Sequence, residues 1–598
     1  MKCYLPVTTE LPAAGRRLLR IAEILGADCV ELRLPAGSSD PIGDIENGVA
    51  EQEACIAICP TVAKEWLGIA SFPSSFANYL SQRFKFLLIH GLDSDPVSCD
   101  MLLKLSQGTV SGVTQAKKNA SLYQVAKDDV TGAFGGLEVS PVNSRDHVFL
   151  MNEGQTLVKP IISIGGKPLF ARLTASAAQI FLLSGITENH LDLEGDLDAR
   201  PVAEYFPQLL PIAMFIRHAF KDECWHPSDV ISASLIIDDP PLWKRYGYVN
   251  YERISAFMDQ YRFHMTMAFI PYYWRRYSTS TVRLFRERPD RFSICFHGND
   301  HTDAEMAATD PRVLAYCLTT AQARMERFTA RTGIRCGKVM AFPQGAFSRS
   351  ALAALKEHNF IGAVNWGHIP TGGQRPALTL ANVLQPSIRY EDGCPFFLRR
   401  PVKRVRPEDI AMDAFVGRPI LLQEHHELFR DPTALFETVT LINRMLPEVT
   451  WRDLQSSLEM AYLVRKSTDS TVSIRPCALA LQIKNTESNS IRYDVEWPDQ
   501  NANVSLGSGS QEYAGVGHDD AHLHSFTLAP GEVGSASQPR EARAAVGPVF
   551  RPSFARIIKI GVRRTLAELR DNYLSRSPVA ISVVKSMRNI LFSPHHAP

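Results

Sequence analysis

Polar residues that can bind a cation follow three apolar runs of the kind that form buried strands. The pair Asp238-Asp239 follows the first run, His297 and His301 follow the second, and the turn Pro343–Gly345 follows the third. Two adjacent carboxylates at the end of an apolar strand lose hydration and repel each other, so such a pair usually lies beside a cation or a network of donors. The placement of these groups therefore predicts a cation site.

The histidine pair has the spacing of a metal site. His297 and His301 are four residues apart, so a helical turn beginning there would direct both imidazoles at one ion, about 2.0–2.1 Å from each ring nitrogen. One carboxylate of the aspartate pair completes the ligand set, which favours zinc although other transition metals accept the same ligands. Such a set leaves positions open for water and a substrate carbonyl, so we expect one divalent metal ion and hydrolytic chemistry.

The elements that must position these residues alternate between strands and helices. Repeated β-α units require parallel strands covered by helices, with functional groups at the carboxyl ends of the strands. We therefore expect an α/β fold whose central region is a distorted parallel (β/α) barrel that carries the catalytic site. The apolar runs predict strands over 231–237, 264–270, 292–296, 338–342 and 362–365, and helices that open at Asn250, span 311–331 and follow Ser348.

Two of the motifs resemble those of the polysaccharide deacetylases of carbohydrate esterase family four. The first family motif, Thr-Phe-Asp-Asp-Gly, is similar to the Ile-Ile-Asp-Asp-Pro sequence at 236–240. The second, His-Ser/Thr-x-x-His, is similar to 297–301, where Gly298 stands in place of the hydroxyl residue. The resemblance covers about 230–455 of the chain, which is under half of its length.

This resemblance implies a role for each residue of the site. In the family the first aspartate is the general base and the second binds the metal. By the resemblance, Asp238 would be the base and Asp239 would bind the metal together with His297 and His301. The resemblance also implies a carbohydrate as the substrate.

Three further family positions are matched only in part. The third motif, Arg-x-Pro-Tyr/Phe-Gly, is similar to 341–345, but Ala341 replaces the arginine that steadies the base. Asn365 stands where the family has an aspartate at a strand end. The last family motif places a histidine after an apolar strand as the general acid, and both His425 and His426 have that position. Either histidine remains a candidate for the acid.

Side chains near the proposed site could also hold a sugar. Flat amphipathic rings stack on sugar faces, although they suit a protein core equally well. Trp366 lies where the family has a groove tryptophan, and Trp274 follows the second predicted strand. Together with the turn residues Pro343 and Gln344, they are the candidate substrate-binding residues.

The composition argues against several classes of protein. Lys plus Arg total 64 and Asp plus Glu total 63, so the summed charge gives no long-range attraction to nucleic acid or to an anionic membrane. No run reaches the ~18 apolar residues needed to cross a bilayer, and the first 34 residues are too charged for a signal peptide. We expect a cytoplasmic protein with no nucleic-acid partner and no transmembrane segment.

At 598 residues the chain is too long for a single hydrophobic core. We expect an N-terminal α/β or α+β domain of unknown role at 1–225 and a deacetylase-like (β/α) barrel at 226–460. A small β-sandwich is expected at 470–550, followed by a helical tail at 551–598 whose helix, near 563–573, is exposed.

The function that follows is a metal-dependent hydrolase, a deacetylase acting on N-acetylated sugars of a surface or exopolysaccharide or of its precursor. Ala341 and Asn365, which replace two family residues, keep a second function open: a non-catalytic carbohydrate-binding or polysaccharide-assembly protein with the same fold. A third is an amidohydrolase with a non-carbohydrate substrate, because a fold and a metal site do not by themselves name the substrate.

Overall fold

The computed structural model describes most of the chain. The described residues are 1–49, 54–67, 72–116, 122–140, 146–152, 157–173, 178–185, 202–368, 370–371, 380–390, 393–468, 470–497, 505–506, 511–513, 523–538, 550 and 552–572. Among these residues, no helix combines the length and the apolar character needed to cross a membrane.

The predicted site lies on a sheet of parallel strands. Its main row of strands contains β13 (Ser232–Asp238), β16 (Met265–Phe269), β17 (Phe292–Phe296), β18 (Cys336–Ala341), β19 (Gly362–Asn365), β20 (Phe396–Leu398), β21 (Arg400–Pro401) and β22 (Ile420–Glu424), and the short strand β23 (Thr450–Trp451) also pairs with β13. They lie in the order β20-β19-β18-β17-β16-β13-β22-β21, and every pair is parallel. The expectation of an α/β fold with parallel strands is confirmed.

The two ends of this row of strands are joined by one short segment of chain. β20 pairs with β19 at one end of the row, while β21 pairs with β22 at the other end. Because β20 and β21 are consecutive in the sequence, the segment 396–401 bridges both ends and the sheet returns on itself. The sequence pattern did not predict this segment as a strand.

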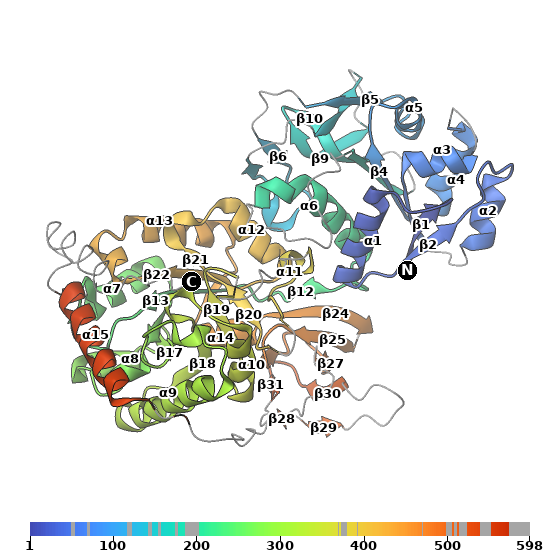
Figure 1. Ribbon diagram of the computed structural model, residues 1–598. Coiled ribbons are helices and arrows are strands. Elements are labelled where there is room, and N and C mark those ends of the chain that lie inside the picture. The colour runs from blue at the N-terminus through green and yellow to red at the C-terminus, as the bar shows by residue number, and fades with distance from the viewer. Residues whose placement is uncertain are drawn as a thin grey trace, which may run out of the picture.

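Helices surround these strands (Figure 1). They are α7 (Tyr251–Tyr261), α8 (Thr279–Glu287), α9 (Pro311–Thr332), α10 (Arg349–Glu357) and α13 (Thr433–Met445). The helix predicted over 311–331 is confirmed, and the apolar stripe of α9 packs in the core between helices and sheet. The predicted starts are also confirmed, because the side chains of Asn250 and Ser348 accept hydrogen bonds from the backbone N–H groups of Arg253 and Ala351.

A mixed sheet precedes the site-bearing sheet in the sequence. Its strands are β1 (Lys2–Val7), β2 (Cys29–Arg33), β3 (Ala54–Ile58), β4 (Phe86–Leu92), β6 (Tyr123–Val125), β7 (Glu138–Val139), β9 (Val158–Ile164), β10 (Lys167–Leu173) and β11 (Gln179–Ser184). They lie in the order β2-β1-β3-β4-β11-β10-β9-β6-β7. The core on this sheet includes buried residues of α1 (Ala13–Leu25), α6 (Val202–Ala219) and α12 (Pro407–Val416), so a later segment of the chain completes it.

Two antiparallel-rich sheets follow the site-bearing sheet. The larger contains β12 (His226–Pro227), β24 (Tyr462–Thr468), β25 (Thr471–Pro476), β27 (Ile491–Glu496), β29 (Gln511–Tyr513) and β30 (Leu523–Leu528). The smaller contains β26 (Ala480–Lys484), β28 (Ser505–Leu506) and β31 (Val533–Ser537). Ile474, Leu481 and Phe526 share one core cluster, so the two sheets pack against each other.

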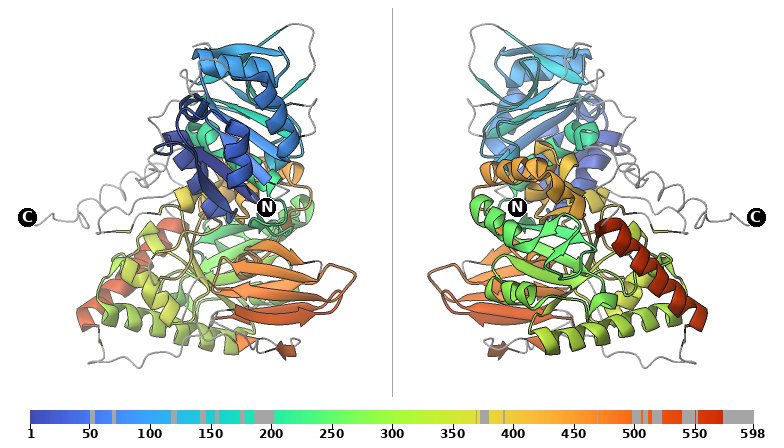
Figure 2. Two further views of the ribbon diagram at one scale, coloured as in Figure 1. Left: turned by 90° about the vertical axis from the view of Figure 1, so that its right-hand side faces the viewer. Right: turned by 90° about the vertical axis from the view of Figure 1, so that its left-hand side faces the viewer.

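The last described element is the helix α15 (Phe554–Asn572), drawn in red across the outside of the site-bearing unit (Figure 2). The expectation of an exposed helix is wrong for one of its faces, because Ile560, Arg564 and Asp571 are buried. This face could not be recognised from the sequence, because its partners lie about 260 to 330 residues earlier in the chain. The rest of the predicted tail, 573–598, lies outside the described residues.

Candidate metal centre

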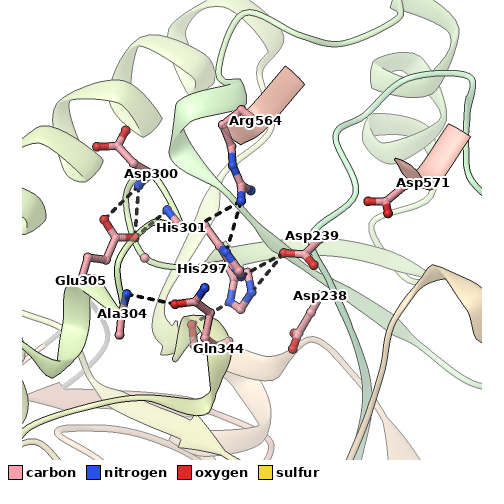
Figure 3. Close-up of polar contacts among 12 residues, drawn as sticks. Asp238, Asp239, His297, Asp300, His301, Ala304, Glu305, Gln344, Arg564 and Asp571 are labelled. Atoms are coloured by element: carbon pink, nitrogen blue, oxygen red, sulfur yellow. Dashed lines mark hydrogen bonds and ion pairs between the residues drawn. The ribbon is translucent and has the colours of Figure 1, made fainter. Parts of the chain in front are cut away.

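Asp239, His297 and His301 meet at the carboxyl ends of β13 and β17 (Figure 3). One ligand atom from each residue lies within 4.8 Å of the other two. The Oδ1 atom of Asp239 is 3.5 Å from Nε2 of His297 and 3.2 Å from Nε2 of His301. The structure thus gathers the residues that the sequence predicted as ligands into one possible metal site.

The donor geometry fits a small divalent cation. Bonds of about 2.0–2.1 Å in a tetrahedral site put two ligand atoms roughly 3.3 Å apart, close to the separations of Asp239 Oδ1 from the two imidazoles. That oxygen is buried and has no hydrogen-bond partner among the described residues. A cation at this point would satisfy an acceptor that is otherwise costly to bury.

The ring orientation of His297 and the protonation state of His301 also fit metal binding. Nδ1 of His297 lies 2.9 Å from the carbonyl oxygen of Ala341, which leaves Nε2 facing Asp239. A hydrogen bond at the ring nitrogen that does not bind the metal fixes the tautomer and the direction of a ligating imidazole. Burial lowers the pKa of His301 to about 3, so this imidazole is neutral near pH 7, the form that binds a metal.

The two histidines converge through a bent loop, so the expectation of a helical turn at 297–301 is wrong. His301 has a φ of 55° and Gly298 a φ of 65°, both in the left-handed region. The buried carboxylate of Glu305 accepts hydrogen bonds from the backbone N–H groups of Asn299, Asp300 and His301 at 2.7–3.1 Å. Glu305 therefore sets the loop shape that brings both rings to the same point.

The geometry also explains Gly298. A Cβ atom at this position would lie 2.2 Å from Oε1 of Glu305 and 2.9 Å from Cγ of Pro343. Because both neighbours are held in place and φ is positive, a serine or threonine does not fit without moving the loop. The close packing of Glu305 and Pro343 thus explains why this chain has a glycine at 298, where the family motif has a serine or threonine.

Asp239 itself has a φ of 85°, a conformation that costs a non-glycine residue free energy. This conformation separates the two acids of the pair. Asp239 turns toward the histidines, while the carboxylate of Asp238 meets the guanidinium of Arg399 in a bidentate ion pair at 2.7 and 2.8 Å. Both partners are buried, with exposed side-chain fractions of 5% and 1%. The two aspartates therefore have different environments.

Arg399 is the functional residue that the sequence analysis missed. It lies between β20 and β21, in the segment that joins the two ends of the sheet, and supplies a guanidinium partner to Asp238. Burial raises the pKa of Asp238, but the charges of Arg399 and His297 more than offset it, so the pKa lies below its usual value. An arginine directly after the apolar run Phe396–Leu398 was the signal in the sequence.

The two candidate acids lie in different places. His425 is exposed and close enough to the site for its charge to lower the pKa of both Asp238 and Asp239. His426 is buried under α15, with Nε2 3.6 Å from Oδ1 of Asp571 and its ring packed edge-on against Tyr246. The placement favours His425 as the group that can exchange a proton at the site.

The candidate substrate-binding residues are distributed more widely. Pro343 is buried against the histidine loop, and Oε1 of Gln344 accepts a hydrogen bond from the backbone N–H of Ala304 at 2.9 Å. Trp366 is 59% exposed and lies over the backbone of Gly345. Trp274 packs against three arginine guanidinium groups, those of Arg275, Arg327 and Arg331. Sugar binding by these four residues stays a prediction.

Solved structures similar to this chain include carbohydrate deacetylases of the kind that the motifs resemble. No protein-family model and no curated protein matches the chain. The crystal structure of Agd3, described as a novel carbohydrate deacetylase, has a TM-score of 0.46 and 10% identity, covering 90% of this chain and 98% of its own.

Two smaller solved structures match a shorter part. A family 4 carbohydrate esterase from Streptomyces lividans has a TM-score of 0.23 and 13% identity, covering 37% of this chain and 91% of its own. The Bc1960 peptidoglycan N-acetylglucosamine deacetylase has a TM-score of 0.24 and 15% identity, covering 39% of this chain and 90% of its own. Because all three TM-scores lie below 0.5, we assign the site from its own geometry.

The helix α15 borders the site on its outer side. The guanidinium of Arg564 donates to the backbone carbonyl of His301 at 3.2 Å (Figure 3). Asp571 accepts a hydrogen bond from the Tyr246 hydroxyl at 2.6 Å. The backbone N–H of Gly247 donates to the side chain of Asn572 at 2.9 Å. The C-terminal helix thus forms part of the rim around the candidate metal centre.

Proposed function

We propose that the chain is a metal-dependent hydrolase that removes the N-acetyl group from sugars of a surface or exopolysaccharide or of its precursor. The observation that carries the proposal is that the two adjacent aspartates at the end of β13 have different partners. Asp239 faces the imidazoles of His297 and His301, while Asp238 is held as a carboxylate by Arg399. We also infer that the parallel sheet joined at 396–401 is the (β/α) barrel expected for such an enzyme.

Asp239, His297 and His301 would hold the cation, for which zinc is the best candidate given these ligands. A bound cation of this kind polarises a carbonyl group and lowers the pKa of water. Asp238 lies next to this point as a fixed carboxylate and accepts a proton from water as the general base. His425, exposed at the same end of the sheet, protonates the departing amine.

The second candidate function is a carbohydrate-binding protein without turnover. Its support was the loss of two family residues, the arginine at 341 and the aspartate at 365. Arg399 now provides the guanidinium that Ala341 lacks, and the amide of Asn365 donates to the carbonyl oxygen of Gly345 at 2.9 Å, which holds the turn after β18. Both replacements are compatible with catalysis, so we favour the hydrolase. A non-carbohydrate amidohydrolase uses the same residues and differs only in substrate.

The test is the release of acetate from N-acetylated oligosaccharides by the zinc-loaded chain, with Asp238→Asn as the comparison. This variant keeps the shape of the side chain and removes the base, so turnover should fall by roughly 10²–10⁴ while the metal content is unchanged. Full activity of Asp238→Asn would contradict the assignment of the base. A wild-type chain that binds metal and sugar and releases no acetate would favour the non-catalytic function instead.

A further inference from the structure

The outward face of α15 is apolar, which is unusual for a helix on the surface of a protein. Ten large apolar side chains are exposed in the part of the chain that the structure describes, and six of them lie on this one helix. Ile558, Val562, Leu566 and Leu569 have the spacing i, i+4, i+8 and i+11, which places them in one stripe along the helix. The six are Phe554, Ile557, Ile558, Val562, Leu566 and Leu569, with exposed fractions of 45–76%.

The charges of α15 are separated between its two faces. Its two acidic residues point inward: Glu568 forms an ion pair with Arg276, and Asp571 accepts the hydrogen bond of Tyr246. The cations beside the apolar stripe are Arg556, Lys559, Arg563 and Arg570. Lys559 and Arg563 also face the carboxylate of Asp303, at 2.9 and 3.8 Å, and Arg570 pairs with Asp571, so these cations outnumber the acids near them. The following residues, 573–598, contain three more Lys or Arg and no Asp or Glu. The C-terminal end of the chain is therefore cationic, although the charge of the whole chain is balanced.

We propose that the outward face of α15 binds the surface of an anionic lipid bilayer. A helix with an aliphatic stripe bordered by Lys and Arg places the stripe among the acyl chains and the cations at the phosphate level. Charge complementarity favours an anionic partner, and the continuous aliphatic stripe favours a lipid surface over nucleic acid, which offers no apolar layer. The inference does not depend on hydrolase activity.

Binding in this way needs no rearrangement of the site. The inward face of α15 stays in contact with His301, Arg276 and Tyr246 while the stripe faces the lipid. The rim of the candidate metal centre is then held close to the bilayer surface. A substrate presented at that surface would meet the site directly.

The experiment is co-flotation of the full chain with phosphatidylcholine vesicles, with and without about one third phosphatidylglycerol. The test variant is Val562→Ser/Leu566→Ser, which removes the centre of the stripe and leaves the inward contacts intact. Leu103→Ser/Val533→Ser is the matched control, because these side chains are equally exposed, at 44% and 46%, on other elements. Thermal unfolding and zinc content verify that each variant is folded.

We expect the wild type and the control to float with the anionic vesicles and about tenfold less with neutral ones. The partition coefficient of Val562→Ser/Leu566→Ser should fall about tenfold or more. Equal flotation of this variant would overturn the proposal and point to residues 573–598. No flotation of the wild type would also overturn it. A wild-type dimer in solution that the variant loses, without vesicle binding, would identify a second copy as the partner.

Discussion

Two adjacent aspartates with the same chemistry have different environments because the backbone turns between them. The positive φ of Asp239 sends its carboxylate to the histidines, while the carboxylate of Asp238 remains in line with the strand and meets Arg399. Strain of this kind persists only where the surrounding structure fixes it, and it is concentrated at functional sites. Separate environments allow one acid to bind a cation and the other to accept a proton.

Removing both imidazoles should remove the metal. The His297→Ala/His301→Ala double variant leaves a single carboxylate, which is too few ligands for tight zinc binding, so elemental analysis after dialysis should give about one zinc per wild-type chain and almost none for the variant. A His218→Ala/His358→Ala variant, with the same number of half-buried histidines removed away from the site, should keep its zinc. Equal metal content in all three proteins would contradict the ligand assignment.

Arg399→Met should affect both stability and turnover. It leaves the carboxylate of Asp238 buried without its partner, which costs about 3–5 kcal/mol of unfolding free energy. Arg399→Lys keeps the charge but loses the bidentate geometry, so it should restore part of the stability and less of the activity.

The double variant Asp238→Asn/Arg399→Met separates the ion pair from simple loss of packing. It removes both charges, so urea unfolding should find it more stable than Arg399→Met alone. If the double variant is less stable than the wild type by the sum of the two single effects, the two residues do not act as a pair. Zinc content should be the same in all of them.

At the scale of the elements, the loop after β17 depends on a short 3-10 turn, Glu305–Ala307, that supplies Glu305. Three backbone N–H groups share this one carboxylate. Arg324 of α9 and Arg564 of α15 add side-chain contacts to the same loop. The position of His301 is therefore set by side-chain contacts, with Glu305 four residues later as the nearest in sequence.

Glu305→Gln should weaken metal binding although Glu305 is not a ligand. The amide has one acceptor oxygen in place of two, and its NH₂ group faces backbone donors, so the loop loses part of its support. We expect zinc affinity to fall about 10–100-fold, the usual effect of changing a group that orients a ligand. Glu408→Gln, at another buried glutamate, is the control and should bind zinc as the wild type does. Calorimetric titration with zinc measures both.

The sequence predicted the strands and the ligands best where a short apolar run ends at a polar or charged side chain. The strands predicted at 292–296 and 362–365 have those bounds in the structure, and the ligands follow the strands as expected. The segment 396–401 was not predicted, because it contains only short pieces that pair with opposite ends of the sheet. Arg399 and Arg564 were missed for the same reason: their partners depend on closure and packing between distant parts of the chain, which local patterns do not encode.

At the scale of the whole molecule, several cores depend on segments from distant parts of the chain. The core of the N-terminal sheet includes α12, and the site-bearing unit is bordered by α15. Unfolding of one part should therefore disturb its neighbours. A buried titratable group in the N-terminal sheet gives a way to measure this.

His90 on β4 should make the stability depend on pH. Burial, with a smaller contribution from the charge of Arg17, lowers its pKa to about 4, against about 6.5 in the unfolded chain. Its neutral form is favoured on folding, so its contribution is fully present above pH 6.5 and is lost as the pH falls from 6.5 toward 4, by up to about 3 kcal/mol. Urea unfolding at pH 7 and pH 4.5 should show this decrease.

His90→Leu should reduce the decrease, because it removes the proton that the unfolded chain binds. Hydrogen exchange of the β4 amides reports the same change locally, and the amides of β17 serve as the comparison within the same molecule. If wild type and His90→Leu lose equal stability between the two pH values, protonation of His90 does not control the acid response.

The segment that joins the two ends of the parallel sheet also has a consequence for synthesis. Asp238 leaves the ribosome 161 residues before Arg399, an interval of roughly ten to thirty seconds at 5–20 residues per second. During this time the carboxylate has no arginine to pair with, and β13 lacks its neighbour β22 until 420–424 has emerged. A nascent chain can therefore bring Asp239, His297 and His301 together well before Asp238 has its partner. In the hydrolase that we propose, zinc would bind to the unfinished chain, and turnover would begin only after Arg399 has paired with Asp238.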